Sequence, residues 1–279
     1  MQNGQKYGKY INMKHQAKDI FEKVSTSDEI FVKAHGLGND FVLIKTDMLA
    51  QDQLISEKFS PERLIKLADR RLGLGADQIL SIDPNFQVNI WNADGSVARM
   101  CGNGLRSLGK WIFSDSAHFN IKGLHDVQLS VSSQVLELHT ISGLVKISKH
   151  EDKIKLHMPF KAKISEDGGV YFVDIGNPHK ICIVSSSPKN LEDYADPNYN
   201  VSCIWLSNGK CNARTWELGT GETCACGSAA FAIASVLDSF GETNLEIHFK
   251  HGSINHIKEG DEIVQVGQAQ IVAVGVLCL

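Results

Sequence analysis

Two cysteine-glycine pairs, one in each half of the chain, constrain its fold more than any other feature. Cys101-Gly102 and Cys226-Gly227 each follow a loop of small and polar residues, and each opens one of the few stretches that have a helical pattern. Turn residues divide most of the remaining chain into short apolar or alternating runs, which are typical of strands. The pattern predicts two similar halves, each a sheet wrapped around one helix that begins at a cysteine.

The hydrophobic pattern gives the expected elements. A proline after the potential cap Ser60 predicts a helix over 61–71, and two more helices are expected at 105–113 and 229–237. The last of these is apolar almost all round, so we expect it to be buried on every side. The expected strands are 30–34, 41–45, 78–82, 86–92, 127–131, 135–139, 144–148, 154–158, 170–175, 181–184, 201–206, 213–218, 245–249, 254–257, 263–266 and 271–277.

These elements predict an α+β fold of two domains, each a sheet or barrel of mostly antiparallel strands around a central helix. Residues 1–28 form a polar extension, residues 29–157 the first domain and residues 158–267 the second. The join falls near His157–Lys161, where a strand ends in Met158-Pro159. We expect the last strand, within 268–279, to return to the first domain.

Composition narrows the class of protein. The 279 residues are 43% hydrophobic with a net charge of −4, which gives no electrostatic case for nucleic acid or an anionic membrane as a partner. No apolar run reaches the ~18–20 residues that span a bilayer, and residues 1–28 lack the apolar centre of a secretory signal. An odd number of cysteines, seven, without a compact framework also predicts a cytoplasmic protein. Three of them lie in apolar runs and are expected in the core: Cys182, Cys203 and Cys278.

The chemistry of the two cysteines follows from their position. A thiol at a helix N-terminus meets unpaired N–H groups and the positive end of the helix dipole, which favour the thiolate and draw its ordinary pKa of ~8.5 toward neutrality. The N–H groups that follow can hold a carboxylate. Two such termini facing each other would place a sulfur on either side of an α-carbon. One thiolate would remove the α-proton while the other thiol protonates the opposite face, which inverts the stereocentre.

Five separate blocks of this sequence together resemble the diaminopimelate epimerase family. The resemblance runs in order from about Phe31 to the C-terminus. The blocks are His35 to Phe41 (HGLGNDF), Gly75 to Gln78 (GADQ), Asn92 to Gly104, Gly176 to His179 (GNPH) and Gly219 to Ser228.

The resemblance implies an epimerase of lysine and cell-wall biosynthesis that uses no cofactor and no metal, is usually a homodimer and acts on a small amino acid. Cys101 and Cys226 would be the catalytic proton acceptor and donor. His179 and Glu217 would modulate the pKa of the thiols. The remaining positions would bind substrate: Asn39, Gln78, Asn92, Gly102, Asn103, Asn177, Asn200, Glu217, Leu218, Gly227 and Ser228.

Leu218 departs from the family pattern. The family has Glu-Arg-Gly where this chain has Glu217-Leu218-Gly219, and its arginine binds the distal carboxylate of diaminopimelate. Losing one partner of a desolvated charge pair typically costs ~2–5 kcal/mol. Arg214 lies on the same strand but roughly 13 Å away by strand rise, so it is a poor replacement. Either another cation binds that carboxylate or the substrate differs at its far end.

Three other functions remain open from the sequence. The chain could racemise a different amino acid, it could be a redox sensor that joins Cys101 to Cys226, or it could be a binding protein that retains the site without catalysis. Cys224 and Cys226 could also form a metal or redox pair, but no second cysteine or histidine pair has zinc spacing. The polar hairpin that contains His248, His251 and His256 is expected to expose all three histidines to solvent.

Overall fold

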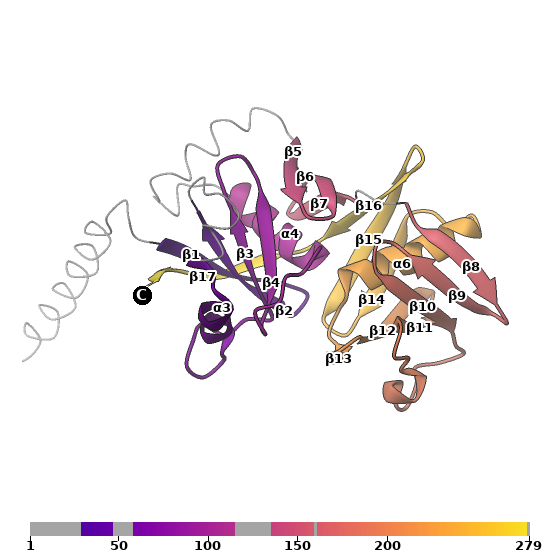
Figure 1. Cartoon of the computed structure of the whole chain (residues 1–279). Helices are drawn as coiled ribbons and strands as arrows, with labels where there is room; N and C mark the ends of the chain where they lie inside the picture. The colour runs from indigo at the N-terminus through magenta and orange to yellow at the C-terminus, as the bar shows by residue number, and fades with distance from the viewer. Residues whose placement is uncertain (1–28, 47–57, 115–134, 159–160, 278–279) are drawn as a thin grey trace, which may run out of the picture.

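The computed structural model describes residues 29–46, 58–114, 135–158 and 161–277. The expected N-terminal extension, the expected strand 127–131 and Cys278 lie outside these residues. Figure 1 shows two strand-rich lobes, each built around one helix. Among the helices of the described residues, none has the length and apolar character needed to cross a membrane.

The first lobe contains a sheet that brings the two ends of the described chain together. In the described part of the chain this sheet has five strands, of which β2 and β3 are parallel and the other neighbours antiparallel. The last strand, yellow in Figure 1, runs back from the other lobe and pairs with the first. The order is β17 (Gln270–Leu277), β1 (Glu29–Gly36), β2 (Asn39–Lys45), β3 (Gln78–Ile82) and β4 (Val88–Asn92).

Both faces of this first sheet are buried, which explains the unbroken apolar run of β2. Alternate side chains of a strand point to opposite faces. Phe41 and Leu43 pack in the cluster that contains helix α4 (Gly102–Ile112), whereas Val42 and Ile44 pack with helix α3 (Pro61–Ala68). The sheet is therefore held between a central helix and a covering one.

Helix α3 is three residues shorter than expected. It begins as predicted, with the Ser60 side chain accepting from the N–H of Arg63. It ends at Ala68 because Asp69 adopts an extended backbone. The Asp69 carboxylate then accepts the N–H groups of the next residues, Arg71 and Leu72, and so fixes a turn instead of another helical residue.

A longer sheet runs from the first lobe into the second. It has twelve strands in the described part of the chain, with β10–β11 and β12–β14 parallel and the other neighbours antiparallel. Two of them, β8 and β13, were not expected; β8 is exposed along its whole length and so has no apolar alternation to reveal it. The order is β5 (Val135–Thr140), β6 (Gly143–His150), β7 (Lys153–His157), β16 (Glu262–Gly267), β15 (Gly252–Glu259), β14 (Leu245–Phe249), β12 (Lys210–Glu217), β11 (Asn200–Ser207), β10 (Pro178–Ile183), β9 (Val170–Asp174) and β8 (Lys163–Asp167), with β13 (Gly221–Thr223) beside β12. A short 3-10 helix, η3 (Leu191–Tyr194), precedes β11.

Each lobe has its own apolar core around one helix. The buried side chains of β5, β6 and β7 join the core around α4, although their hydrogen bonds belong to the longer sheet. Helix α6 (Gly227–Ser239) forms the centre of the second core and is buried from Ala229 to Val236, as its all-apolar sequence predicted. The α+β fold class is thus confirmed. The domain boundary at residue 157 stays a prediction, because β7 pairs with β16 across it.

Two expectations about burial are wrong. His256 is 2% exposed, because β15 turns this side chain inward with Ile254 and it packs beside Phe231. His251 is exposed and His248 half-buried. Of the cysteines expected in the core, Cys203 is buried but its neighbour on the next strand, Cys182, is only half-buried, because β10 approaches the surface there.

Candidate active site

Cys101 and Cys226 are the N-cap residues of α4 and α6, and the two helices begin beside each other. A Cβ atom placed on Gly227 would lie 3.5 Å from both the backbone nitrogen of Asn103 and the Cα of Gly102. The Nδ2 of Asn103 also donates to the carbonyl of Ala225 at 3.2 Å. Residues without a side chain permit this approach of two backbones. The structure therefore brings together the two helix termini that the sequence singled out.

The thiol of Cys101 lies among polar groups from α4 and β2. The N–H of Gly104 donates to its sulfur at 3.3 Å, and the sulfur lies 3.9 Å from Oδ1 of Asn39. The same Asn39 oxygen lies 3.4 Å from Nδ2 of Asn103. The Nδ2 of Asn39 donates to the carboxylate of Asp77 at 2.9 Å. Asn39 therefore links the end of the β1–β2 turn to the first turn of α4.

Gln78 and Asn92 form a pair on neighbouring strands. They are opposite each other in the β3–β4 register, and Nε2 of Gln78 donates to Oδ1 of Asn92 at 2.8 Å. Oε1 of Gln78 is buried and has no hydrogen-bond partner among the described residues. Oε1 of Gln78 can therefore accept a further hydrogen bond.

The thiol of Cys226 lies among residues of the second lobe. Its sulfur is 3.3 Å from Oγ of Ser228, to which Nδ2 of Asn177 donates at 3.5 Å. Glu217, at the end of β12, hydrogen-bonds to the same thiol and accepts from Thr223. A hydroxyl, an amide and a carboxylate thus surround the second sulfur.

His179, Asn200 and Leu218 lie next to this group. His179 and Asn200 are partners in the parallel β10–β11 register, and Oδ1 of Asn200 accepts the N–H of Leu218 at 3.0 Å. His179 is fully buried, which lowers its pKa to about 4 and keeps the ring neutral at pH 7. Leu218 has a side chain 40% exposed. The structure therefore places this departure from the family pattern at the protein surface.

The thiols differ from the expectation that helix termini draw their pKa toward neutrality. Burial raises the pKa of Cys101 to about 12 and that of Cys226 further above its ordinary value. The carboxylate of Glu217 adds to both effects, while the Gly104 N–H and Arg106 partly counteract burial at Cys101. The expectation is wrong for this structure because loss of solvation outweighs the helix termini.

Sequence reasoning missed a layer of buried polar residues beneath the two helix termini. Arg106, Gln265 and His256 are all 2% exposed or less and hydrogen-bond to one another in a chain. The one signal for it was Gln265, which interrupts the apolar run of β16. Arg106 carried no signal, because a helical pattern does not distinguish a buried arginine from an exposed one.

Cys224 and Cys226 have the spacing of a metal or redox pair. In the parts of the chain that the structure describes, no three His, Cys, Asp or Glu side chains lie close enough together to hold a metal ion. Cys226 is instead directed at Ser228 and Glu217.

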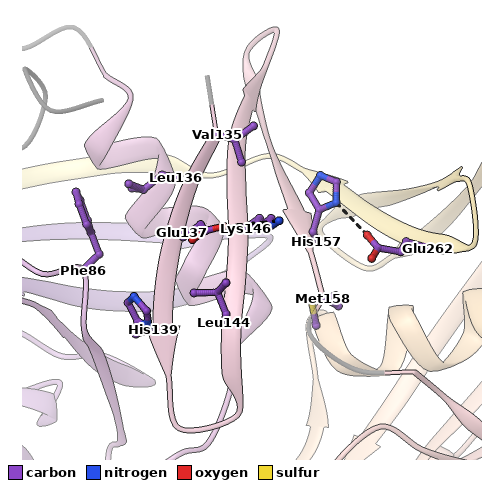
Figure 2. Close-up of a pocket in the computed structure, with 10 residues that line it drawn as sticks. All are labelled: Phe86, Val135, Leu136, Glu137, His139, Leu144, Lys146, His157, Met158 and Glu262. Atoms are coloured by element: carbon purple, nitrogen blue, oxygen red, sulfur yellow. Dashed lines mark hydrogen bonds and ion pairs between the residues drawn. The ribbon is translucent and has the colours of Figure 1, made fainter. Parts of the chain in front are cut away.

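A cavity of about 880 Å³ lies elsewhere, along the β5–β7 strands (Figure 2). His157 and Glu262 face each other across its rim, with 3.5 Å between Nδ1 and a carboxylate oxygen. None of the site residues expected from the sequence lines this cavity. It is therefore separate from the two helix termini.

Known proteins resemble this chain over most of its length. A family model for diaminopimelate epimerase matches residues 31–158. The diaminopimelate epimerase of Rickettsia canadensis (strain McKiel) is 34% identical in a match 277 residues long; the match covers 89% of this chain and 97% of that protein. The chain belongs to the diaminopimelate epimerase family. It is accordingly an isomerase, an amino-acid epimerase, as expected.

Two solved structures outside the close relatives share the fold. A putative phenazine biosynthesis PhzC/PhzF protein from Clostridium difficile (strain 630) is 10% identical, with a TM-score of 0.65 over 90% of this chain and 100% of that one. A probable proline racemase from Agrobacterium radiobacter K84 is 12% identical, with a TM-score of 0.61 over 90% and 93%. At these identities the likeness shows that the two proteins share the fold of this chain. It does not show that they share its substrate.

Proposed function

We propose that this member of the family interconverts LL- and meso-2,6-diaminopimelate by proton transfer between Cys101 and Cys226, without a cofactor. The observation that carries the proposal is the meeting of two helix N-termini, each begun by a cysteine. Family membership supports the same substrate, and the reaction would serve lysine biosynthesis. The roles of the individual site residues in this reaction are part of the same proposal.

The reaction uses both helix termini at once. The N–H groups of Gly102, Asn103, Gly227 and Ser228 bind the carboxylate beside the reacting carbon. One thiolate takes the α-proton; the C–H bond breaks, an S–H bond forms and the electron pair moves into an enediolate whose oxygens the N–H donors stabilise. The opposite thiol then donates its proton to the other face of the carbon and becomes the thiolate.

Leu218 supports a second candidate, racemisation of an amino acid with a single carboxylate. The neighbouring cation is not available for a distal carboxylate, because Nε and Nη2 of Arg214 bond to the two oxygens of Glu222 at 2.6 and 2.7 Å. Arg70, near Asn39, is likewise paired with Asp40 and Asp77. A distal carboxylate would therefore need a donor other than these two arginines.

Turnover of LL-diaminopimelate, compared with that of a panel of single-carboxylate amino acids, distinguishes the diaminopimelate epimerase from the racemase. We expect the highest kcat/KM on diaminopimelate, and inactivity on it with turnover of another amino acid would overturn the proposal. Leu218→Arg sharpens the comparison. If diaminopimelate is the substrate, the added cation should lower its KM while leaving the single-carboxylate amino acids unaffected; Val272→Ala, at an exposed position of β17, is the control.

The expected partners are a small amino acid and a second copy of this chain. The homodimer is part of the proposal, since the family resemblance is its basis. Sedimentation of the purified protein would measure it, and a monomer at all concentrations would contradict it.

A further inference from the structure

A buried arginine lies beneath the two helix termini. Arg106 is fully buried, and its guanidinium donates to Oε1 of Gln265 through Nη1 and to Oδ1 of Asn103 through Nη2. Among the described residues, no carboxylate lies within ion-pair distance of it. Both partners are neutral amides, so its positive charge is solvated by dipoles alone. Burying a cation in this way is costly, which calls for a compensating role.

The partners of Arg106 belong to the first turns of both helices. Asn103 is the second residue of α4. Gln265 connects to the other helix, because its Nε2 donates to the carbonyl of Gly227 at 2.9 Å and lies 3.1 Å from Nε2 of His256. One guanidinium therefore connects the two helix termini: it reaches α4 through one hydrogen bond, to Asn103, and α6 through two, by way of Gln265.

Close packing fixes the guanidinium in this position. A Cβ atom on Gly267 would lie 2.7 Å from Nε of Arg106, and one on Gly102 would lie 3.7 Å from Nη1. The backbone of Gly267 therefore packs against the guanidinium, and Gly102 lies close to it. The charge is thus near the first turn of α4, whose N–H groups are proposed to bind the substrate carboxylate.

We propose that Arg106 is a positioning residue: it holds the first turns of α4 and α6 together and supplies a buried positive charge that favours the thiolate of Cys101 and the bound carboxylate. The part concerning the carboxylate rests on the proposed function, whereas the part concerning the thiol does not. The carboxylate of Glu217 opposes this effect, and it raises the pKa of both thiols. His256 stays neutral, with a pKa of about 3, and so adds no charge.

The direct test is the rate of Cys101 alkylation by iodoacetamide at one fixed pH near neutrality, without substrate, resolved by mass spectrometry of the cysteine peptides. Arg106→Met removes the charge but keeps a long apolar side chain, and Arg106→Lys keeps the charge. We expect Cys101 to react about tenfold more slowly in Arg106→Met, since an opposite charge nearby typically shifts a pKa by about one unit and the thiolate fraction changes with it. In Arg106→Lys the rate should stay near the wild-type value. Ser235→Ala, a buried hydroxyl on α6 that bonds only within its helix, is the matched control.

Activity gives a second readout. We expect kcat of Arg106→Met to fall about 100-fold, the usual size of losing one donor that stabilises developing charge, with a smaller loss in Arg106→Lys. An unchanged rate of Cys101 alkylation in folded Arg106→Met would overturn the proposal, and so would two Arg106 variants that both fail to fold. If wild-type enzyme turned over no amino acid but the alkylation rate still fell in Arg106→Met, the proposed function would fail while the role of Arg106 at the thiol stood.

Discussion

The two helix termini match in backbone and differ in charge. At α4 the sulfur of Cys101 accepts the Gly104 N–H, and a cation lies one turn further on, at Arg106. At α6 the sulfur of Cys226 has no such cap bond, and its charged neighbour is the carboxylate of Glu217. A cation favours a thiolate and a carboxylate opposes it. Because burial raises the pKa of both thiols, the difference teaches that a near-symmetrical site can make one thiol easier to ionise than the other.

The largest expected effect follows from replacing either cysteine with alanine. Inversion needs one group to accept the proton and another to donate it from the opposite face, so each variant should lose about 10³-fold or more in epimerisation. The measurement is conversion of LL- to meso-diaminopimelate, with circular dichroism to show that the variant is folded. Near-normal activity in either variant would show that this cysteine does not transfer a proton and would contradict the two-cysteine mechanism.

Acid should destabilise the α6 half, which contains both His179 and His256. Burial lowers their pKa values from 6.5 to about 4 and about 3. A histidine held neutral stabilises the fold fully above pH 6.5, because below it the unfolded chain binds protons that the folded chain does not. The free energy of unfolding should therefore fall by a few kcal/mol as the pH drops from 6.5 to about 4.

Urea unfolding of the wild type and of His256→Leu across this range measures the effect. The variant will be less stable overall, because Gln265 loses a hydrogen-bond acceptor. Its free energy of unfolding should nevertheless change less with pH than that of the wild type. Equal slopes would show that His256 already protonates in the folded state.

Gly267→Ala probes the packing beneath α4. The added methyl group would lie 2.7 Å from Nε of Arg106, so the guanidinium or β16 must move. Overpacking of this kind typically costs about 1–3 kcal/mol. The midpoint of urea unfolding should fall and kcat with it, whereas Val272→Ala should change neither. A Gly267→Ala protein with wild-type stability and activity would show that Arg106 has room to shift.

Glu217→Gln should reduce the contrast between the two thiols. Without the carboxylate, the pKa of Cys226 should fall by about one unit, since a like charge nearby disfavours ionisation. The rate of Cys226 alkylation at one fixed pH near neutrality measures this, because it follows the thiolate fraction and should rise about tenfold. Glu222→Gln is the control, because its carboxylate pairs with Arg214 instead. An unchanged rate of Cys226 alkylation would mean that Glu217 is protonated in the resting enzyme, in keeping with the raised pKa that burial gives it.

Much of the fold could be predicted from the sequence because both lobes obey simple periodicities. Two-sided burial gives β2 its continuous apolar run, and the all-apolar α6 is buried as expected. The end of α3 could not be predicted, because it depends on the Asp69 carboxylate capturing two backbone N–H groups. The continuous sheet through β7 and β16 joins residues more than 100 positions apart, and no local pattern encodes such pairing.

The two cysteines of the site could be predicted from the sequence. The layer of buried polar residues beneath them could not. Cys101 and Cys226 lie in glycine-containing loops whose chemistry can be deduced from neighbouring residues. The inward turn of His256 and the burial of Arg106 depend on what packs above them, namely α6 and β16. The pKa of the thiols likewise depends on their loss of solvent, which only a three-dimensional structure contains.

Solvent deuterium incorporation in the first percent of reaction tests the two-thiol account most directly. With LL-diaminopimelate in deuterium oxide, the account predicts that each meso product molecule carries one deuterium at the inverted carbon while recovered substrate carries none, because the donor thiol exchanges with solvent and the acceptor delivers nothing back. Deuterium appearing equally in substrate and product, or a product that retains the original hydrogen, would show that a single group does both jobs and would contradict the account.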